Sequence, residues 1–427
     1  MIGWSRTFTR RTSLSEIKSL YAAVLGLSSP WTVERVETNL SAGEVEVWVA
    51  LPKQVRWVCP ECHAAAPIHD HQERSWRHLD TCQFRTIVHA RVPRLNCPTH
   101  GIRQLTVPWA EPGSQFTALF EALAIDWLKQ ASVSAVAKHL RISWDEADGI
   151  LGRAVKRGLA RRDAVAPRYV GIDETAYQKR HEYVTVVSDL ERGIVLDVAD
   201  DRRRESLDAF WKGLSPAQID RIEGVAMDMW GPYIQSTLEH LPDADSKIVF
   251  DKFHLAKYLN DAVAQVRRSE HRRLLAEGFS LLAGTKYDWL RHPGSLTHPE
   301  KCALAALRSQ IGRLGRAWGL KEMAMKIFDL TAPWAAERNF KAWLFLAMRS
   351  KLEPIKHVAR MLRRHWHHVR NYFVHRITNA GSESMNAKIQ RVKARSCGFR
   401  NRERFRQAIY FHCGGLDLYP AGVRRGQ

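Results

Sequence analysis

The stretches YVGIDETAY (residues 169–177) and GVAMDMWGPY (residues 224–233) decide how the fold is interpreted. Each contains an apolar run of the kind that forms a buried strand, and each run reaches an aspartate, Asp173 in the first and Asp228 in the second. Alternation along the first strand puts Val170 and Ile172 on one face and Gly171 and Asp173 on the other. The two stretches therefore predict carboxylates at the ends of two buried strands.

The segments around these aspartates predict a mixed sheet. Three strands come first, with the sequences YVGIDETA, EYVTVVSDL and IVLDVAD. Helices and strands then alternate, with the sequences RESLDAFWKGL, IEGVAMD, PYIQSTLEHL, SKIVFD and HLAKYLNDAVAQVRR. This order matches the ribonuclease H-like fold, in which helices pack on both faces of a mixed sheet. The chain as a whole is therefore predicted to be a multidomain α/β protein with a ribonuclease H-like catalytic domain. In that topology the first and fourth strands are neighbours, so Asp173 and Asp228 can face each other across about 5 Å.

Two carboxylates at that distance repel each other and need a proton or a cation. A pair of Mg²⁺ ions, or Mn²⁺ in substitution, suits hard oxygen ligands. Two such ions can activate a water molecule and stabilise the leaving oxygen in phosphodiester cleavage. The aspartate pair therefore predicts a two-metal site for phosphoryl chemistry.

Glu383, in TNAGSESMNAKIQRVK, is the candidate third carboxylate. In the helix expected there, Met385, Ile389 and Val392 form the buried stripe. Glu383 shares the opposite, polar face with Asn386 and Gln390. The alternative is an acid that only favours the helix dipole, but two strand-end aspartates upstream favour catalysis. Asp251 and His254, beside another strand end, are expected next to the site; the alternative for them is a strand-end cap.

Two knuckles, WVCPEC and LNCPTHG, predict a structural zinc site. The ligand set is Cys59, Cys62, Cys97 and His100, a Cys3His zinc ribbon. The alternative is a pair of turns with ordinary cysteines, and the fourth ligand has substitutes in Cys82, His63, His69, His71 and His78. Binding could supply on the order of 10 kcal/mol of folding free energy. Seven cysteines at uneven spacing argue against a disulfide framework and for a reducing cytosol.

Residues 113–162 predict a helix-turn-helix. A short helix and a longer basic helix are separated by Arg141-Ile142, and Ser143 with Glu146 forms a capping box. The alternative is a small helical bundle, but the basic context favours DNA binding. The residues expected to contact DNA there are Arg153, Lys156 and Arg157.

The net charge of +20 is typical of a protein with a polyanionic partner, most often nucleic acid. Between Lys388 and Arg406, eight Lys or Arg residues stand against one acid, with Phe399 and Phe405 interleaved to stack on an unpaired base. The alternative is a solvated helix face. The expected DNA contacts in this basic tail are Lys388, Arg391, Lys393, Arg395 and Arg400.

These patterns divide the chain into predicted regions. Those regions are a leader (1–54), the zinc ribbon (55–108), the helix-turn-helix (113–162), the first part of the catalytic domain (167–265), an all-helical insertion (266–370), and the second part with the basic tail (371–427). No apolar run reaches 18 residues, so we expect no membrane span and a cytoplasmic location.

The motifs GIDET, YVTVVSDL, MDMWGPY, VFDKFHLAKYLN and TNAGSESMNAKI resemble the DDE transposases of bacterial insertion sequences, specifically the ISL3 family. The resemblance runs from about residue 55 to 415 and puts the family's acids on Asp173, Asp228 and Glu383. It implies water-driven cleavage at the element end, followed by attack of the freed 3′ hydroxyl on target DNA. It also implies recognition of terminal inverted repeats by the zinc ribbon and helix-turn-helix, a homodimer or larger assembly on double-stranded DNA, and action at the nucleoid.

Three other functions compete with this interpretation. A ribonuclease H-like nuclease without strand transfer would carry the same acids, and a repurposed DNA-binding regulator would bind without cutting. A zinc-dependent hydrolase is disfavoured because the sequence has no H-E-x-x-H motif.

Overall fold

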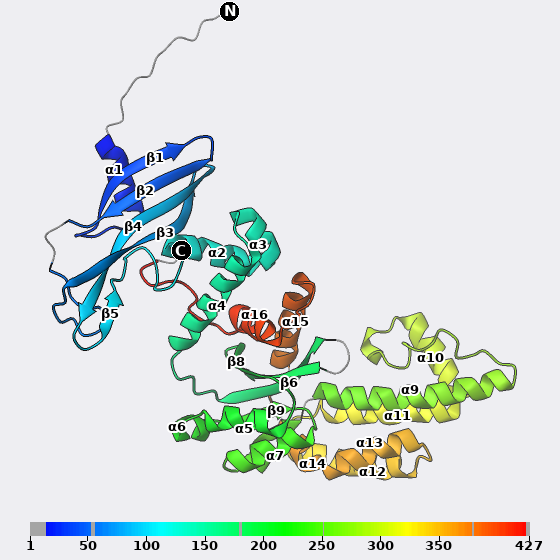
Figure 1. The fold of residues 1–427 in the computed structure, drawn as a ribbon. Helices are drawn as coiled ribbons and strands as arrows, with labels where there is room; N and C mark the ends of the chain where they lie inside the picture. Colours follow the sequence, from blue (N-terminus) through cyan, green and yellow to red (C-terminus); the bar gives the residue numbers. More distant parts are fainter. Residues whose placement is uncertain (1–13, 53–55, 179–181, 251, 378–379, 424–427) are drawn as a thin grey trace, which may run out of the picture. The chain divides into compact units, whose positions relative to one another are not determined.

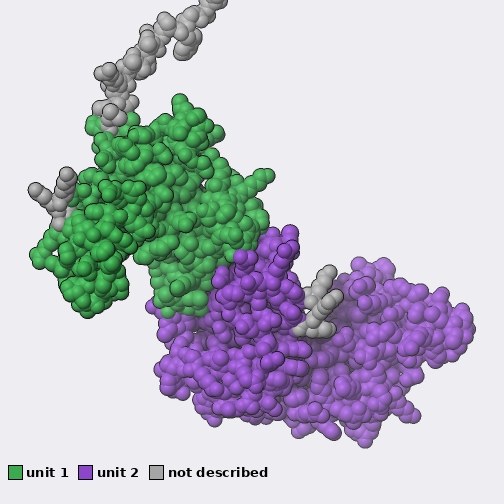
Figure 2. All heavy atoms as spheres, in the orientation of Figure 1, with its two compact units in different colours: residues 1–162, 416–427 green, residues 163–415 purple. Residues whose placement is uncertain are grey.

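The structure is a computed structural model that describes residues 14–52, 56–178, 182–250, 252–377 and 380–423. The chain forms two compact units, residues 1–162 with 416–427 and residues 163–415 (Figure 2). Within the described ranges, no helix is both long enough and apolar enough to cross a membrane.

The first unit begins with helix α1 (Leu14–Val24) and a five-stranded sheet (Figure 1). Its strands are β1 (Thr32–Asn39), β2 (Glu44–Ala50), β3 (Ile68–Thr81), β4 (Phe84–Cys97) and β5 (Gly101–Gln104). The order is β1-β2-β4-β3, with β5 on β4. Alternate side chains of β2 face the core, and Val45, Val47 and Val49 are all buried.

The prediction of a leader over residues 1–54 needs correction. Helix α1, β1 and β2 lie in this region, and β2 pairs in parallel with β4. The side chains of β2 therefore share a core with Trp31, Trp76 and Trp109. A parallel pair joins segments that are distant in sequence, so the local pattern of β2 did not reveal its partner.

Three helices follow in the same unit: α2 (Ala118–Gln130), α3 (Val133–Leu140) and α4 (Trp144–Ala160). Side chains of Thr117, Ser132 and Ser143 cap them, and the predicted capping box of Ser143 and Glu146 is present. The chain returns to this unit at its end, where Leu418 is buried. Residues 416–427, predicted to belong with the second half of the catalytic domain, instead belong to the unit that holds α2–α4.

The second unit contains a sheet of β6 (Tyr169–Gln178), β7 (Glu182–Asp189), β8 (Ile194–Ala199), β9 (Gly224–Met227) and β10 (Ile248–Phe250). The order is β10-β9-β6-β7-β8. Strands β6, β7 and β8 are antiparallel neighbours, and β6, β9 and β10 run parallel. The first and fourth strands are therefore neighbours, as the sequence predicted.

Helices cover both faces of this sheet (Figure 1). One face packs in a common core with α5 (Arg204–Lys212), α7 (Gly231–His240) and α9 (Lys252–Ala276). The short helices α6 (Pro216–Asp220) and α8 (Ala244–Lys247) complete the connections. The other face contacts α15 (Ala380–Arg395) and α16 (Arg402–Cys413).

The stretch predicted to be all-helical is helical in the structure except for turns between residues 277 and 292. It contains η1 (Pro293–Ser295), α10 (His298–Gln310), α11 (Gly312–Ile327), α12 (Pro333–Arg349), α13 (Glu353–Arg364) and α14 (Trp366–His375). The predicted boundaries at 265/266 and 370/371 fall inside α9 and α14. Both helices run through those positions because their apolar side chains share one core with the sheet.

Candidate active site and DNA-binding elements

Asp173 lies on the face of β6 that meets α15. Val170 and Ile172 point into the core on the opposite face. The Asp173 carboxylate accepts a hydrogen bond from the Glu174 amide at 2.7 Å and one from Asn386 Nδ2 at 2.7 Å. Gly171 permits this approach, because a Cβ there would lie 2.5 Å from Ser382 Oγ. The glycine and the aspartate thus share the face that the alternation predicted.

The register between β6 and β9 carries both strands toward the same end of the sheet. Tyr169 pairs with Gly224 and Gly171 with Ala226. The pairing ends there, and Asp173 and Asp228 each follow it by two residues, so both aspartates lie at this end of the paired strands. The electrostatics agree with this: burial first, and then the charges of Asp228 and Asp173, raise the pKa of Glu174, although Arg202 opposes them.

Asp228 accepts hydrogen bonds from two directions. The Met229 amide donates at 2.6 Å, and His254 Nδ1 lies 3.2 Å from Oδ2. Burial alone would raise the pKa of Asp228, but the hydrogen bond and charge of His254, with help from Met229 and Lys257, lower it overall. Asp228 is therefore ionised at neutral pH, as a cation ligand must be. Asp251, predicted beside this site, lies outside the described residues.

Glu383 is exposed in the first turn of α15. The predicted buried stripe of Met385, Ile389 and Val392 is confirmed. The polar face meets β6: Asn386 binds Asp173, and Gln390 Nε2 donates to Thr175 Oγ1 at 2.9 Å. Residues three apart on a helix lie on the same side, so Glu383 is one turn before Asn386 on that face. Along α15, Asn386 and its partner Asp173 come before Gln390 and its partner Thr175, so the turn that carries Glu383 adjoins the Asp173 contact.

The sequence reasoning missed a polar network on the other face of β6. Glu174 lies 3.7 Å from Arg202, whose guanidinium packs over Trp230 and Tyr183. Burial raises the pKa of the neighbouring Tyr233, and the Tyr233 hydroxyl lies 2.6 Å from Thr185 Oγ1. Strict alternation places Glu174 on the opposite face from Asp173, as the sequence predicts, and the two acids therefore have different environments.

The four predicted zinc ligands lie together. Their ligand atoms are all within 4.8 Å of one another. Cys62 Sγ lies 3.6 Å from Cys97 Sγ, and His100 Nδ1 lies 3.7 and 3.8 Å from the sulfurs of Cys97 and Cys59. With zinc–sulfur bonds of about 2.3 Å, tetrahedral ligands are spaced by about 3.5 to 4 Å. The donor set therefore fits Zn²⁺.

A second layer of side chains orients His100. Its Nε2 lies 3.6 Å from a Glu61 oxygen, and Arg103 Nε donates to Glu61 at 2.6 Å. A carboxylate behind a ligating imidazole fixes the tautomer and the ring orientation. Backbone amides also lower the pKa of the Cys59 and Cys97 thiols. The site matches a structural zinc centre in both layers.

The prediction that Arg157 contacts DNA needs correction. Its side chain is only 7% exposed, its Nη2 lies 2.9 Å from Glu121, and its Nε donates to Glu111 at 2.8 Å. Two carboxylates hold this buried guanidinium, so it cannot reach a phosphate. Arg153 is half-buried and also pairs with Glu121, whereas Lys156 is exposed on α4.

The basic tail divides in a similar way. Lys388, Arg391 and Arg400 are exposed. Lys393 Nζ donates to the Ala176 carbonyl at 2.7 Å, and Arg395 is half-buried against His412. Phe405, predicted to stack on a base, is fully buried and packs against Tyr177 and Phe399. The stacking prediction for Phe405 is therefore wrong.

The comparisons with known proteins cover all three regions. A family described as "Transposase" (DDE_Tnp_ISL3) matches residues 170–409. The zinc finger of transposases IS204/IS1001/IS1096/IS1165 matches residues 56–100, and the helix-turn-helix domain of transposase family ISL3 matches residues 105–155.

Two curated relatives extend the match over most of the chain. The transposase for insertion sequence element IS1557 of Mycobacterium tuberculosis is 27% identical, over 90% of this chain and 92% of the relative. The transposase for insertion sequence element IS1001 of Bordetella parapertussis is 25% identical, over 89% of this chain and 95% of the relative. With its zinc ribbon, its helix-turn-helix and a transposase domain that spans more than half of its length, the chain belongs to the ISL3 family of insertion-sequence transposases.

Proposed function

We propose that this transposase cuts and joins DNA through a triad of Asp173, Asp228 and Glu383. The observation that carries the proposal is the parallel pairing of β6 and β9, which Asp173 and Asp228 each follow by two residues. In the proposal the two carboxylates therefore lie side by side. The contacts of Asn386 and Gln390 bring the polar face of α15, and with it Glu383, toward the same strand.

The three carboxylates would hold two Mg²⁺ ions, or Mn²⁺ in their place. Hard, ionised oxygen donors suit these cations, and the lowered pKa of Asp228 keeps that donor charged. Bound there, the ions would supply Lewis-acid activation of the attacking oxygen and stabilisation of the leaving oxygen. The chain itself orients the ligands: Asn386 fixes Asp173, and His254 fixes Asp228.

The sheet order supports a ribonuclease H-like catalytic domain. Three antiparallel strands are followed by two strands parallel to the first, with helices on both faces. In this proposal the catalytic domain comprises residues 167–265 and 371–415, and residues 266–370 form a helical insertion. The two connections between the catalytic domain and the insertion lie within α9 and α14, and both helices share the core of the sheet.

The zinc ribbon and helix-turn-helix would recognise the terminal inverted repeats of the element. The exposed side chains Lys156, Lys388, Arg391 and Arg400 are available to phosphates. Arg153, Lys393 and Arg395 are partly buried and would have to leave their present partners to contribute. A homodimer or larger assembly would bring the two element ends together at the nucleoid.

The test compares the wild type with Asp228→Asn on a duplex that carries the element's own end, in Mg²⁺. We expect the wild type to cleave at the end and to join the 3′ hydroxyl to a target duplex. The variant should bind the same duplex and lose cleavage. Asp197→Asn, on β8, is the matched control and should cleave normally.

Three other outcomes would change the assignment. Cleavage without joining would identify a nuclease, and binding without cleavage by the wild type would favour a regulator. Full cleavage by Asp228→Asn would refute the triad.

A further inference from the structure

A second group of metal-ligating side chains lies in the catalytic unit, outside the proposed triad. Asp245 is in α8, the short helix that leads into β10, and His367 and His368 are adjacent residues in α14. One ligand atom from each of the three side chains lies within 4.8 Å of the other two.

The three side chains converge on one point. His367 Nε2 lies 3.2 Å from Asp245 Oδ1, and His368 Nε2 lies 3.1 Å from the same oxygen. Residues adjacent on a helix normally point about 100° apart. Here the two imidazole rings are only 3.7 Å apart. Tetrahedral zinc with bonds of about 2.0–2.2 Å spaces its nitrogen and oxygen ligands by about 3.3–3.6 Å, close to these distances.

The backbone that carries Asp245 is held in place by α14. Asn371 Nδ2 donates to the carbonyls of Asp245 and Ile248, both at 2.8 Å. His375 Nε2 lies 2.8 Å from the Ser246 carbonyl. His368 is buried, and its ring packs edge-on against Phe250 at 5.0 Å. The backbone near Asp245 and the ring of His368 are thus held by neighbouring residues that are not ligands. A preformed metal site requires such support.

We propose that Asp245, His367 and His368 bind a divalent transition-metal ion, with Zn²⁺ the expected occupant. Two imidazoles and a carboxylate are donors that suit Zn²⁺ and its first-row neighbours. The exposed side chains of His367 and Asp245 leave the fourth position open to water.

Such an ion would tie two segments that are distant in sequence. It would join α14, at the end of the all-helical stretch, to α8 at the start of β10. Helix α15, which carries Glu383, begins shortly after α14. The site is independent of the proposed triad, because none of its residues belongs to it.

The experiment counts metal ions on the full-length protein after equilibration with Zn²⁺, using elemental mass spectrometry. The variants are His367→Ala and Asp245→Asn, both at exposed positions where folding is not at risk. His357→Ala, an exposed histidine in α13, is the matched control. Titration with Co²⁺ separates the sites, since only the zinc ribbon gives a thiolate charge-transfer band.

We expect His357→Ala to hold as many zinc ions per chain as the wild type. His367→Ala and Asp245→Asn should each hold one ion fewer, with the thiolate band unchanged. Equal counts in the wild type and these two variants would overturn the proposal and leave two imidazole–carboxylate hydrogen bonds. Loss of the thiolate band in the variants would also overturn it, because the missing ion would then be that of the ribbon. Neither result depends on DNA cleavage.

Discussion

At the scale of single residues, the contact between His254 and Asp228 is a positioning contact that can be tested by pH. His254 lowers the pKa of Asp228, against the effect of burial. In His254→Ala the pKa of Asp228 should rise. On acidification the Asp228 carboxylate should then become protonated at a higher pH than in the wild type. We expect cleavage about 10–100-fold slower at neutral pH, the range found for residues that support metal ligands. The acidic limb of the rate profile should move to higher pH.

The matched control for this prediction is His240→Ala. His240 also lies beside an aspartate, 3.5 Å from Asp208, but on α7 and away from the proposed triad. A merely structural effect would slow both variants without moving the acidic limb. An unchanged pH profile in His254→Ala would show that His254 does not tune Asp228, and raised Mg²⁺ should partly restore the rate if it does.

The features that could be predicted from the sequence are those with a local signature. The cluster of Cys59, Cys62, Cys97 and His100 was found by knuckle spacing. The strands that lead to Asp173 and Asp228 were found by their apolar runs, and the roles of these two acids stay a prediction. Arg157 was misplaced because its partners Glu111 and Glu121 are distant in sequence. A helical pattern shows that a side chain is basic, but it does not show which acid neutralises it.

At the scale of elements, α4 carries two cations with opposite expected roles. Arg157 is buried between two carboxylates, and Lys156 is exposed one residue earlier. Breaking a buried ion pair by removing one partner costs about 3–5 kcal/mol. Arg157→Ala should therefore lower the unfolding free energy of the first unit by about that much, measured by denaturant titration.

Lys156→Ala, the neighbouring variant, should leave stability within about 0.5 kcal/mol of the wild type. It should weaken binding to duplex DNA and reduce the salt dependence of binding by about one unit of slope. Equal destabilisation by both substitutions would contradict the structural role of Arg157, and unchanged DNA affinity in Lys156→Ala would remove Lys156 from the interface.

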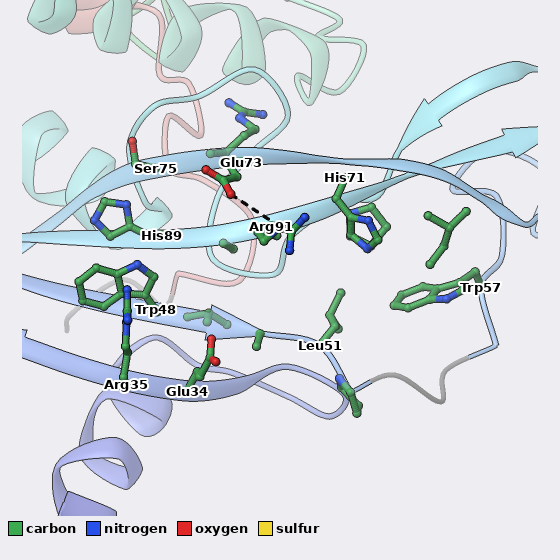
Figure 3. Close-up of a pocket in the computed structure, with 17 residues that line it drawn as sticks. Glu34, Arg35, Trp48, Leu51, Trp57, His71, Glu73, Ser75, His89 and Arg91 are labelled. Carbon is green, nitrogen blue, oxygen red and sulfur yellow. Dashed lines mark ion pairs between the residues drawn. The ribbon is translucent and has the colours of Figure 1, made fainter.

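The same contrast between local and distant signals applies to whole elements. The caps of α2, α3 and α4 involve residues within one helical turn, so the helix-turn-helix was predictable from sequence. The role of β2 was not, because its partner β4 is about forty residues away and the pairing is parallel. The pocket on this sheet was not predictable from the sequence either. Arg35 packs there over Trp48, and Trp48 stacks on His89 (Figure 3).

At the scale of the whole molecule, the chain enters and leaves the catalytic unit by way of the DNA-binding unit. The first crossing lies after residue 162 and the second after residue 415. The end of the chain is then also a structural part of the unit that is expected to bind the element end.

The C-terminal segment is held by several contacts within the first unit. Leu418 is buried and its carbonyl accepts a hydrogen bond from Arg157. Arg161 Nη1 donates to the Tyr419 carbonyl at 2.6 Å, and Lys129 Nζ lies 2.5 Å from the Tyr419 hydroxyl. A Cβ at Gly158 would lie 2.7 Å from Leu416, so α4 and this segment are in close contact. The segment therefore completes the environment of α2 and α4.

Deleting residues 416–427 should loosen α2 and α4 while leaving the second unit folded. Leu418→Ala is the milder version and should cost about 2–5 kcal/mol, the usual effect of truncating a buried leucine. Hydrogen exchange over residues 118–160 should speed up in both variants, and affinity for the element end should fall with it. A chain that ends at Val423 is the control and should match the wild type. If exchange in α4 stays at the wild-type rate after the larger deletion, the segment only rests on the helices, and the DNA-binding unit ends at residue 162.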